Sequence, residues 1–397
     1  MSFITGLTRM WLTRTAKTFT FKNGYDQILP YAECENLGLY VHIPFCKSIC
    51  NFCPYCKVRY SAELCDRYID SLIQEIHIVG SQHAEHRKAT SLYFGGGTPA
   101  LAANRIKEIV NALSEHFIIT EGIGLELHPD NVNVETLQML KDAGVTKISI
   151  GIQSFCDKYQ KILGRKKIDT AEMMSALSAV SFETVSMDFI FALPGQTYDD
   201  LKSDIDTAFS LGANHVAIYP FIDFTFTESP VTAMPKKDKR ELLDAITQYC
   251  LGKGYSRNSI WTFSSGTDAN YSSMTRDNFL GFGCSATSLF KEQFKINTFD
   301  VDSYCERIRS GNLATSLTIR FTKRQRMVYW LFWTAYSTRV TAEDFEKFFG
   351  VSLKKMYGFE LWVAKQLGLV KEHNGTYEMT LKGAFYYHYY ENFYTLS

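Results

Sequence analysis

The 397-residue chain lacks any run of about 18 apolar residues, the length that a membrane-spanning helix requires. Its first 21 residues carry Arg9, Arg14 and Lys17 and contain no continuous apolar stretch of the kind found in secretory signals. The sequence therefore predicts a cytoplasmic protein without a membrane span. In that compartment its ten cysteines are expected to be thiols, and a dense group of them indicates a metal site rather than disulfides.

Net charge is also absent, because 42 Lys and Arg residues balance 42 Asp and Glu residues. Binding to nucleic acid requires clustered positive charge, so this balance argues against nucleic acid as the main partner. The sequence has no internal repeat and no low-complexity tract. Hydrophobic residues make up 46% of the chain, which is enough for a large core, and the length suggests two or three domains.

Short apolar runs alternate with amphipathic stretches between residues 39 and 222. The runs are 39–45, 91–94, 124–127, 147–152, 185–193 and 215–221, and helices are expected at 62–79, 103–116, 134–143, 170–180 and 197–211. Strands that alternate with helices predict βαβ units and a parallel sheet. We therefore expect an α/β fold in which residues 39–222 form a partial (β/α)6 barrel, with chemistry at the C-terminal ends of the strands.

The remaining segments are assigned to an N-terminal extension (1–38), an α/β extension that completes the core (223–320) and a C-terminal module (321–397). In the last of these, helical stretches at 341–349 and 353–367 precede a hairpin whose turn is Asn374-Gly375. This order predicts a helical, winged-helix-like module. Its positive charges are interspersed with glutamates, so we interpret it as a lid or docking piece rather than a DNA reader.

Four cysteines fall within eleven residues directly after the first predicted strand. Cys46, Cys50 and Cys53 form a CxxxCxxC loop, and Cys56 follows. Cysteine thiolates are the usual ligands of iron–sulfur clusters, and three ligands on a four-iron cluster leave one iron open to another molecule. A four-cysteine zinc or ferredoxin site that includes Cys56 is the alternative. Structural zinc sites usually separate their ligands into two pairs, whereas ferredoxin cysteine runs have similarly tight spacing.

The motifs that follow resemble those of the radical S-adenosylmethionine (SAM) superfamily and, within it, the oxygen-independent coproporphyrinogen III oxidase family. The resemblance covers nearly the whole chain from Leu39. It includes the cysteine loop, Gly95-Gly96-Gly97-Thr98-Pro99 after the second strand, the segments 126–129, 149–155 and 163–165, the segment 188–197, and Gly281-Phe-Gly-Cys-Ser-Ala286. Their order and spacing match those of the family.

This resemblance implies a [4Fe–4S] cluster on Cys46, Cys50 and Cys53 that binds SAM and cleaves it reductively to a 5′-deoxyadenosyl radical, and both one and two bound SAM molecules stay open. It also implies an electron donor such as flavodoxin or ferredoxin. The residues that match the family's cofactor contacts are Tyr40, Phe52, Gly96, Gly97, Thr98, Glu126, Gln153, Arg165, Asp188 and Ala286. A carboxylate inside a barrel is costly unless it is paired, which favours a ligand role for Glu126. Arginine suits a carboxylate through its fork of donors.

The chain departs from the family where the substrate is expected to bind. Lys167 replaces a common histidine, and Trp261-Thr-Phe263 and the segment 271–276 replace the usual late motifs. An aromatic content of 14% is compatible with a bulky core or with a pocket for a large apolar substrate. Hydrogen abstraction and methyl or methylene transfer from a second SAM both stay open. The alternative is a haem-binding chaperone with a vestigial SAM site, for which His388 is the candidate axial ligand.

We predict that replacing Cys46, Cys50 or Cys53 by Ala abolishes both the brown absorbance of the cluster and SAM cleavage, because each thiolate holds one iron. Iron content and absorbance of the anaerobically reconstituted variants test this. Full iron content in any one of the three variants would show that the ligand assignment is wrong.

Overall fold

The computed structural model describes residues 10–15, 19–50, 52–222, 232, 234–266 and 277–391, with side chains described up to residue 387. A twelve-stranded sheet, in the order β11-β12-β10-β9-β8-β7-β5-β1-β13-β14-β15-β16, forms its centre. The strands are β1 Leu37–Ile43, β5 Leu92–Gly96, β7 Ile123–Leu127, β8 Lys147–Gln153, β9 Thr184–Phe191, β10 His215–Pro220, β11 Ser256–Arg257, β12 Thr262–Ser264, β13 Asn278–Phe282, β14 Thr287–Leu289, β15 Gln293–Asn297 and β16 Thr315–Arg320.

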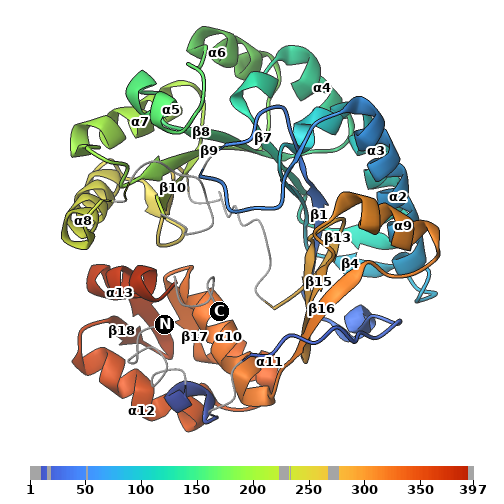
Figure 1. The fold of residues 1–397 in the computed structure, drawn as a ribbon. Helices are drawn as coiled ribbons and strands as arrows, with labels where there is room; N and C mark the ends of the chain where they lie inside the picture. Colours follow the sequence, from blue (N-terminus) through green and yellow to red (C-terminus); the bar gives the residue numbers. More distant parts are fainter. Residues whose placement is uncertain are drawn as a thin grey trace.

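Six neighbouring strands, β1, β5, β7, β8, β9 and β10, run parallel. These are the six strands that the apolar runs predict, and the sheet curves into the arc of a partial barrel (Figure 1). The structure adds a seventh parallel strand, because β13 pairs with the other side of β1. Antiparallel strands then flank the parallel set at both ends.

Helices cover the outer face of this arc (Figure 1). They are α2 Ala62–Gly80, α3 Ala103–Ser114, α4 Val134–Asp142, α5 Asp157–Ile162, α6 Thr170–Ala179, α7 Tyr198–Ser210, α8 Lys236–Gly252 and α9 Val301–Arg309. Polar side chains fix several helix starts. Ser61 and Asn133 accept backbone N–H bonds at the starts of α2 and α4, and Thr197 and Asp200 form a capping box at α7.

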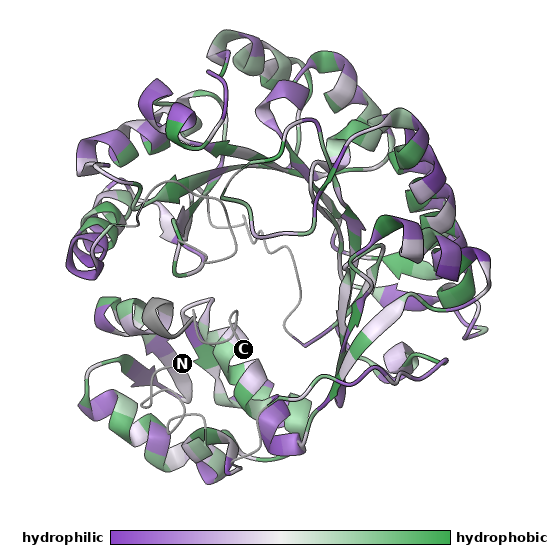
Figure 2. Cartoon of the chain, viewed as in Figure 1, coloured by the Kyte–Doolittle hydropathy of each residue, from purple (hydrophilic) through white to green (hydrophobic). Residues whose placement is uncertain are grey.

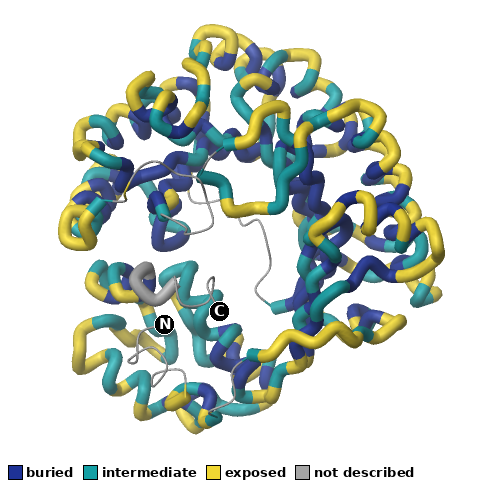
Figure 3. The backbone as a smooth tube through the Cα atoms, in the orientation of Figure 1, coloured by how far each residue is buried: buried dark blue, intermediate teal, exposed yellow. Residues whose placement is uncertain are grey.

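Shorter elements complete the core region. They are the 3-10 helices η1 Pro30–Glu33, η2 Pro99–Ala102 and η3 Pro129–Asn131, and the short strand pairs β2 Phe45–Cys46 with β3 Val58–Arg59 and β4 Arg87–Ala89 with β6 Phe117–Ile119. The strands are buried, whereas the helices expose their outer faces (Figure 3). The hydropathy pattern follows the same division, with hydrophobic residues on the strands and on the inner helix faces (Figure 2).

The C-terminal module contains α10 Lys323–Ala335, β17 Arg339–Thr341, α11 Ala342–Phe349, α12 Leu353–Gln366, β18 Val370–His373, β19 Thr376–Met379 and α13 Leu381–Glu391. A three-stranded sheet, β17-β19-β18, packs with α11 and α12, as expected for a winged-helix-like module. The predicted hairpin turn lies between β18 and β19. The module has its own apolar core around Trp330 and Phe345.

This module joins the two ends of the open sheet. It continues directly from β16, and the backbone N–H of Ile260 beside β12 donates to Tyr336 O at 3.1 Å. The Trp261 and Tyr336 rings pack edge-on with centroids 5.4 Å apart. The module thus occupies the opening between the β12 end and the β16 end of the sheet, as Figure 1 shows.

The N-terminal segment also contacts the module. The Trp11 ring packs at 6.1 Å from that of Phe359, and Arg14 forms an ion pair with Glu360. Further along, Lys22 bridges to Thr318 of β16. The segment assigned to an N-terminal extension therefore packs against elements from the other end of the chain. Among the described residues, no helix is long and apolar enough to cross a bilayer.

Candidate active site

The motif residues of the parallel strands gather at one edge of the sheet. Glu126, Gln153 and Asp188 lie at or near the C-terminal ends of β7, β8 and β9, and the cysteine loop follows β1. Strand pairing places Asp188 beside Gly151 and Glu126 beside Ser149, so these positions are neighbours across the sheet. The structure therefore brings together residues that lie far apart in the sequence.

The cysteine loop is closed at its base by backbone pairing. Cys46 of β2 lies opposite Arg59 of β3, and the Tyr60 N–H donates to Cys46 O at 2.9 Å. Lys57 donates to the carbonyl oxygen of Cys53. Burial raises the pKa of the Cys46 thiol to about 11 and also raises the pKa of Cys53. At neutral pH these groups are thiols unless a metal displaces their protons.

The glycine run is bonded to the entrance of this loop. Gly97 N–H donates to Ile43 O at 2.9 Å and Thr98 N–H donates to Phe45 O at 2.8 Å. A Cβ at Gly97 would lie 2.6 Å from Phe45 O, so only glycine permits this approach. The amides of Gly97 and Thr98 thus hold the loop, and the Thr98 hydroxyl lies 4.0 Å from the Cys46 sulfur. Contacts of Gly96, Gly97 and Thr98 with SAM stay predictions.

Two side chains of β1, those of Tyr40 and His42, extend the polar site. Sequence reasoning singled out Tyr40 but not His42. Tyr40 and His42 point to the same face, and the Tyr40 hydroxyl lies 2.9 Å from His42 Nδ1. His42 Nε2 lies 3.3 Å from Cys56 O. A carbonyl can only accept, so Nε2 carries the proton and Nδ1 accepts from Tyr40. Burial lowers the pKa of His42 to about 4, which keeps the ring neutral. The i, i+2 spacing of Tyr40 and His42 was the available signal.

Glu126 is a carboxylate among few donors. Its oxygens accept from the Tyr93 hydroxyl at 3.2 Å and from the Gly96 N–H at 3.3 Å. Burial, followed by the negative charge of Asp188, raises the pKa of Glu126 to about 7. The side chain is nevertheless partly exposed, because it faces the inside of the barrel. Within the described residues, no Lys or Arg forms an ion pair with it.

Asp188 has a similar environment. It accepts from the Ser149 hydroxyl at 2.8 Å and from the Ser186 hydroxyl at 3.2 Å. Burial raises the pKa of Asp188 to about 6. Asp188 and Arg165 do not form an ion pair with each other among the described residues. Ser149 and Ser186 are functional-site neighbours that sequence reasoning missed, since a serine in a strand carries no distinctive signal.

Gln153 and Arg165 converge on Gly151. Gln153 adopts a left-handed conformation with φ of 70° at an irregularity in the pairing of β8 with β9. A Cβ at Gly151 would lie 3.0 Å from Gln153 Nε2 and 3.9 Å from Arg165 Nη2. Arg165 donates to Gly151 O, while its buried Nε has no hydrogen-bond partner among the described residues. A left-handed non-glycine residue is costly and is typical of functional sites.

Phe52 connects the cysteine loop to this region. Its ring lies 6.0 Å from the Arg165 guanidinium carbon and packs against an apolar cluster that includes Leu163 and Ile190. Ala286 is buried in the turn after β13, where its N–H donates to Gly283 O at 3.2 Å. Contacts of Phe52 and Ala286 with an adenine stay predictions.

Cys56 has protein partners of its own. Its thiol donates to Phe299 O at 3.3 Å, and the Cys284 thiol donates to Thr298 O at 3.2 Å. Hydrogen bonding with Cys284 is the main cause that lowers the pKa of Cys56 to about 7. This pairing supports the expectation that Cys56 is not a cluster ligand.

The late substitutions fall into two groups. Trp261 and Phe263 are buried, and Phe263 belongs to β12. They therefore contribute to packing at the end of the sheet. The segment 271–276 lies outside the described residues, as does the side chain of His388.

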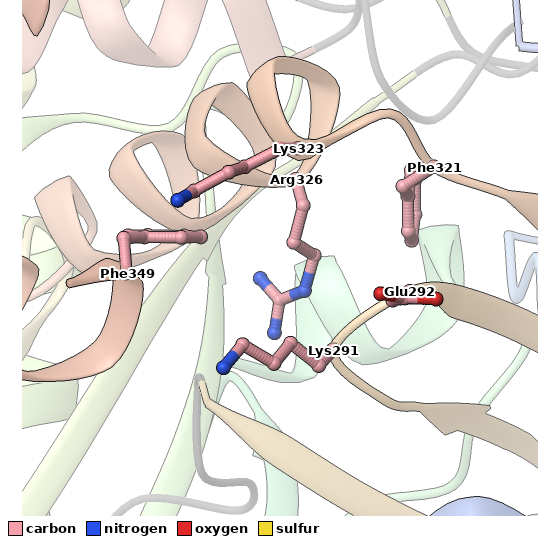
Figure 4. A pocket seen from close by; sticks show the side chains of 6 residues that line it. All are labelled: Lys291, Glu292, Phe321, Lys323, Arg326 and Phe349. Carbon is pink, nitrogen blue, oxygen red and sulfur yellow. The ribbon is translucent and has the colours of Figure 1, made fainter. Parts of the chain in front are cut away.

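A separate cavity of about 260 Å³ lies elsewhere in the molecule (Figure 4). Lys291, Glu292, Phe321, Lys323, Arg326 and Phe349 line it. Leu289 pairs with Phe279 near the start of β13, so the β14–β15 turn lies at the N-terminal edge of the parallel strands. The cavity is thus on the opposite edge from the cysteine loop.

Comparison with known families agrees with the motifs and the geometry. Residues 40–208 match the model of the Radical SAM superfamily, so this part of the chain is similar to a radical SAM domain. Its relatives are of the oxygen-independent coproporphyrinogen III oxidase and HemW type, as the sequence motifs predict.

Two curated relatives carry these different names. The chain is 28% identical over 360 residues to the heme chaperone HemW of Lactococcus lactis, covering 87% of this chain and 93% of that protein. It is 25% identical over 381 residues to the oxygen-independent coproporphyrinogen III oxidase of Pseudomonas aeruginosa, covering 85% and 81%. In fold it matches coproporphyrinogen III oxidase HemN from Escherichia coli with a TM-score of 0.76 and 22% identity, covering 88% of both chains.

The match to the Radical SAM model implies a [4Fe–4S] cluster and SAM, and the residues present fit both. Cys46, Cys50 and Cys53 offer three thiols within one eight-residue loop that follows β1. Glu126 and Asp188 offer two carboxylates without a cationic neighbour among the causes of their pKa shifts. By contrast, the buried carboxylate of Glu75 has Lys295 beside it. A cationic ligand would compensate the first two.

We predict that Cys56→Ala retains the four-iron cluster and most SAM cleavage, because three thiolates suffice for the cluster and the Cys56 thiol donates to Phe299 O. Iron content and absorbance after reconstitution measure this, with Cys53→Ala as the matched comparison. Loss of the cluster in Cys56→Ala would favour a four-cysteine site.

We predict that Glu126→Gln and Arg165→Leu each weaken SAM binding with the cluster intact. A hydrogen bond to a charged group contributes about 1.5–3 kcal/mol, so roughly 10- to 150-fold weakening is expected. Equilibrium binding to the reconstituted protein measures it, and Glu121→Gln, at an exposed position before β7, is the control.

The pH dependence of SAM affinity distinguishes a direct charge effect of Glu126 from a general effect of the substitution. Because its pKa is about 7, the carboxylate becomes ionised as the pH rises through neutrality, and its attraction for a cationic ligand strengthens in the same range. Glu126→Gln is expected to remove that rise. Wild-type SAM affinity in both variants would contradict these assignments.

Proposed function

We propose that this protein is an enzyme that reductively cleaves SAM at a [4Fe–4S] cluster on Cys46, Cys50 and Cys53 and uses the radical on a large apolar or conjugated substrate. The cluster and SAM supply the electron and the 5′-deoxyadenosyl radical when they are bound. The observation that carries the proposal is the cysteine loop together with two nearby carboxylates, Glu126 and Asp188, with which no described Lys or Arg forms an ion pair.

The chain's own residues divide the binding of SAM by charge. Glu126, at the end of β7, is assigned to the amino group, because its carboxylate has only the neutral donors Tyr93 and Gly96. The guanidinium group of Arg165 and the amide of Gln153 lie beside Gly151, and both are assigned to oxygen atoms of SAM. The Phe52 ring lies 6.0 Å from the Arg165 guanidinium carbon and is assigned to shielding this side of the ligand from water.

A second SAM would explain why the polar groups extend beyond one ligand's needs. Asp188 is bonded to two serines rather than to Arg165, so both side chains retain capacity for other partners. A methyl or methylene group would then pass from the second SAM to the substrate. We include this transfer in the proposal because Asp188 lies in β9 whereas Arg165 lies in the loop after α5, so the two groups can serve different ligands.

A haem chaperone is the second candidate, and the similarity to HemW of Lactococcus lactis over 93% of that protein favours it. It requires haem binding without turnover of SAM. The buried His42 ring lies near the cysteine loop and already has hydrogen-bond partners on both nitrogens. It is therefore a poor axial ligand for haem iron.

We predict that the reconstituted protein, incubated anaerobically with SAM and a low-potential reductant, produces deoxyadenosine. With the true substrate we expect S-adenosylhomocysteine as well, and label from the SAM methyl group in the product. Chromatography of the nucleosides measures both. Glu126→Gln with an intact cluster is the matched low-activity control.

The outcomes distinguish the candidates. Deoxyadenosine alone, without label in the product, would rule out methyl or methylene transfer and leave oxidation or rearrangement. Stoichiometric haem binding, seen in a spectral titration, together with no SAM cleavage would contradict the enzyme and support the chaperone.

A further inference from the structure

A group of metal-ligating side chains lies where α2 and α3 end. His77 is in the last turn of α2, while Glu115 and His116 directly follow α3. Their ligand atoms all lie within 4.8 Å of one another, the one such set of His, Cys, Asp and Glu groups that meets this limit in the described residues. Helices that follow parallel strands return to the N-terminal edge of the sheet, so the group lies at the opposite edge from the cysteine loop.

The distances match tetrahedral coordination. His77 Nδ1 and His116 Nε2 are 3.2 Å apart, and His77 Nδ1 lies 3.8 Å from Glu115 Oε2. Two nitrogens bound to zinc at about 2.0–2.1 Å with a tetrahedral angle lie about 3.3 Å apart. The glutamate is the exposed member, with 65% of its side chain accessible, and a small rotation would bring its oxygen to the same separation.

The position of His116 is built into the fold. Its ring lies against Gly80, where an added Cβ would come within 2.3 Å of His116 Cγ. The carbonyl of His116 accepts from the Arg87 N–H at 3.0 Å, and its own N–H donates to Leu113 O at 3.0 Å. Glycine at position 80 thus lets the ring approach α2 closely enough for its Nε2 to face His77.

We propose that His77, Glu115 and His116 bind a divalent transition-metal ion, with Zn²⁺ the best match to two imidazoles and one carboxylate. Water completes the coordination, since the His77 side chain is 44% exposed and the site opens to solvent. The ion ties the end of α2 to the turn before β6. It is a second metal site, independent of SAM and of the function proposed above.

The test uses full-length protein that carries its iron–sulfur cluster, so that Cys46, Cys50 and Cys53 are occupied. Calorimetric titration with Zn²⁺ is expected to show one more site in the wild type than in the double variant His77→Gln/His116→Asn, or at least a tenfold weaker affinity there. His373→Gln, at an exposed position of β18, is the matched control and is expected to bind as the wild type does. Zn²⁺ should also raise the Tm of the wild type but not that of the double variant.

Two further measurements distinguish this site from metal binding at free thiols. Co²⁺ bound at the histidines gives visible ligand-field bands without thiolate charge-transfer absorption, whereas binding at free cysteines gives that absorption. Gly80→Ala keeps all three ligands but displaces His116, and weaker Zn²⁺ binding is expected. Equal stoichiometry and affinity in the wild type and the double variant, or Co²⁺ spectra with thiolate absorption alone, would overturn the proposal, as would wild-type affinity in Gly80→Ala.

Discussion

The site depends on the close approach between two backbones at the end of β1 and β5. Gly97 and Thr98 donate to Ile43 and Phe45 and so extend sheet-like pairing beyond the last residues of the two strands. A side chain at Gly97 would collide with this pairing. The start of the cysteine loop, including Cys46 of β2, is therefore positioned by backbone hydrogen bonds between protein groups.

Local signals in the sequence identified most of the barrel. The six parallel strands and the helices between them follow the apolar periodicity, and caps such as Asn133 and Thr197 fix where helices begin. Strand β13 was not recognised as a parallel partner of β1. It has only five residues, one of them Gly281, and its pairing joins parts of the chain more than 200 residues apart. Periodicity carries no information about such contacts.

The same contrast holds for the site. Motif spacing singled out the cysteines, Glu126, Arg165 and Asp188 as candidates, since these residue types are chemically distinctive. Their immediate environment could not be predicted from sequence. Ser149 bonds to Asp188, and the Gly97 and Thr98 amides bond to the start of the cysteine loop. Whether a serine or an amide faces a carboxylate depends on register, and a shift of one residue turns it to the other face.

The way in which the C-terminal module fills the opening of the sheet has a consequence for internal motion. Neighbouring strands are held by ladders of backbone hydrogen bonds, so separating them requires a cooperative loss. Between β12 and the module, the part of the chain that the structure describes has one backbone hydrogen bond, from Ile260 to Tyr336, together with ring contacts. Apolar packing also holds this seam, because Ala384 and Tyr387 of α13 belong to the main core of the barrel and Phe332 packs against it. A small shift of the module would therefore repack side chains and leave the strand pairing, and with it the geometry of the cysteine loop, intact.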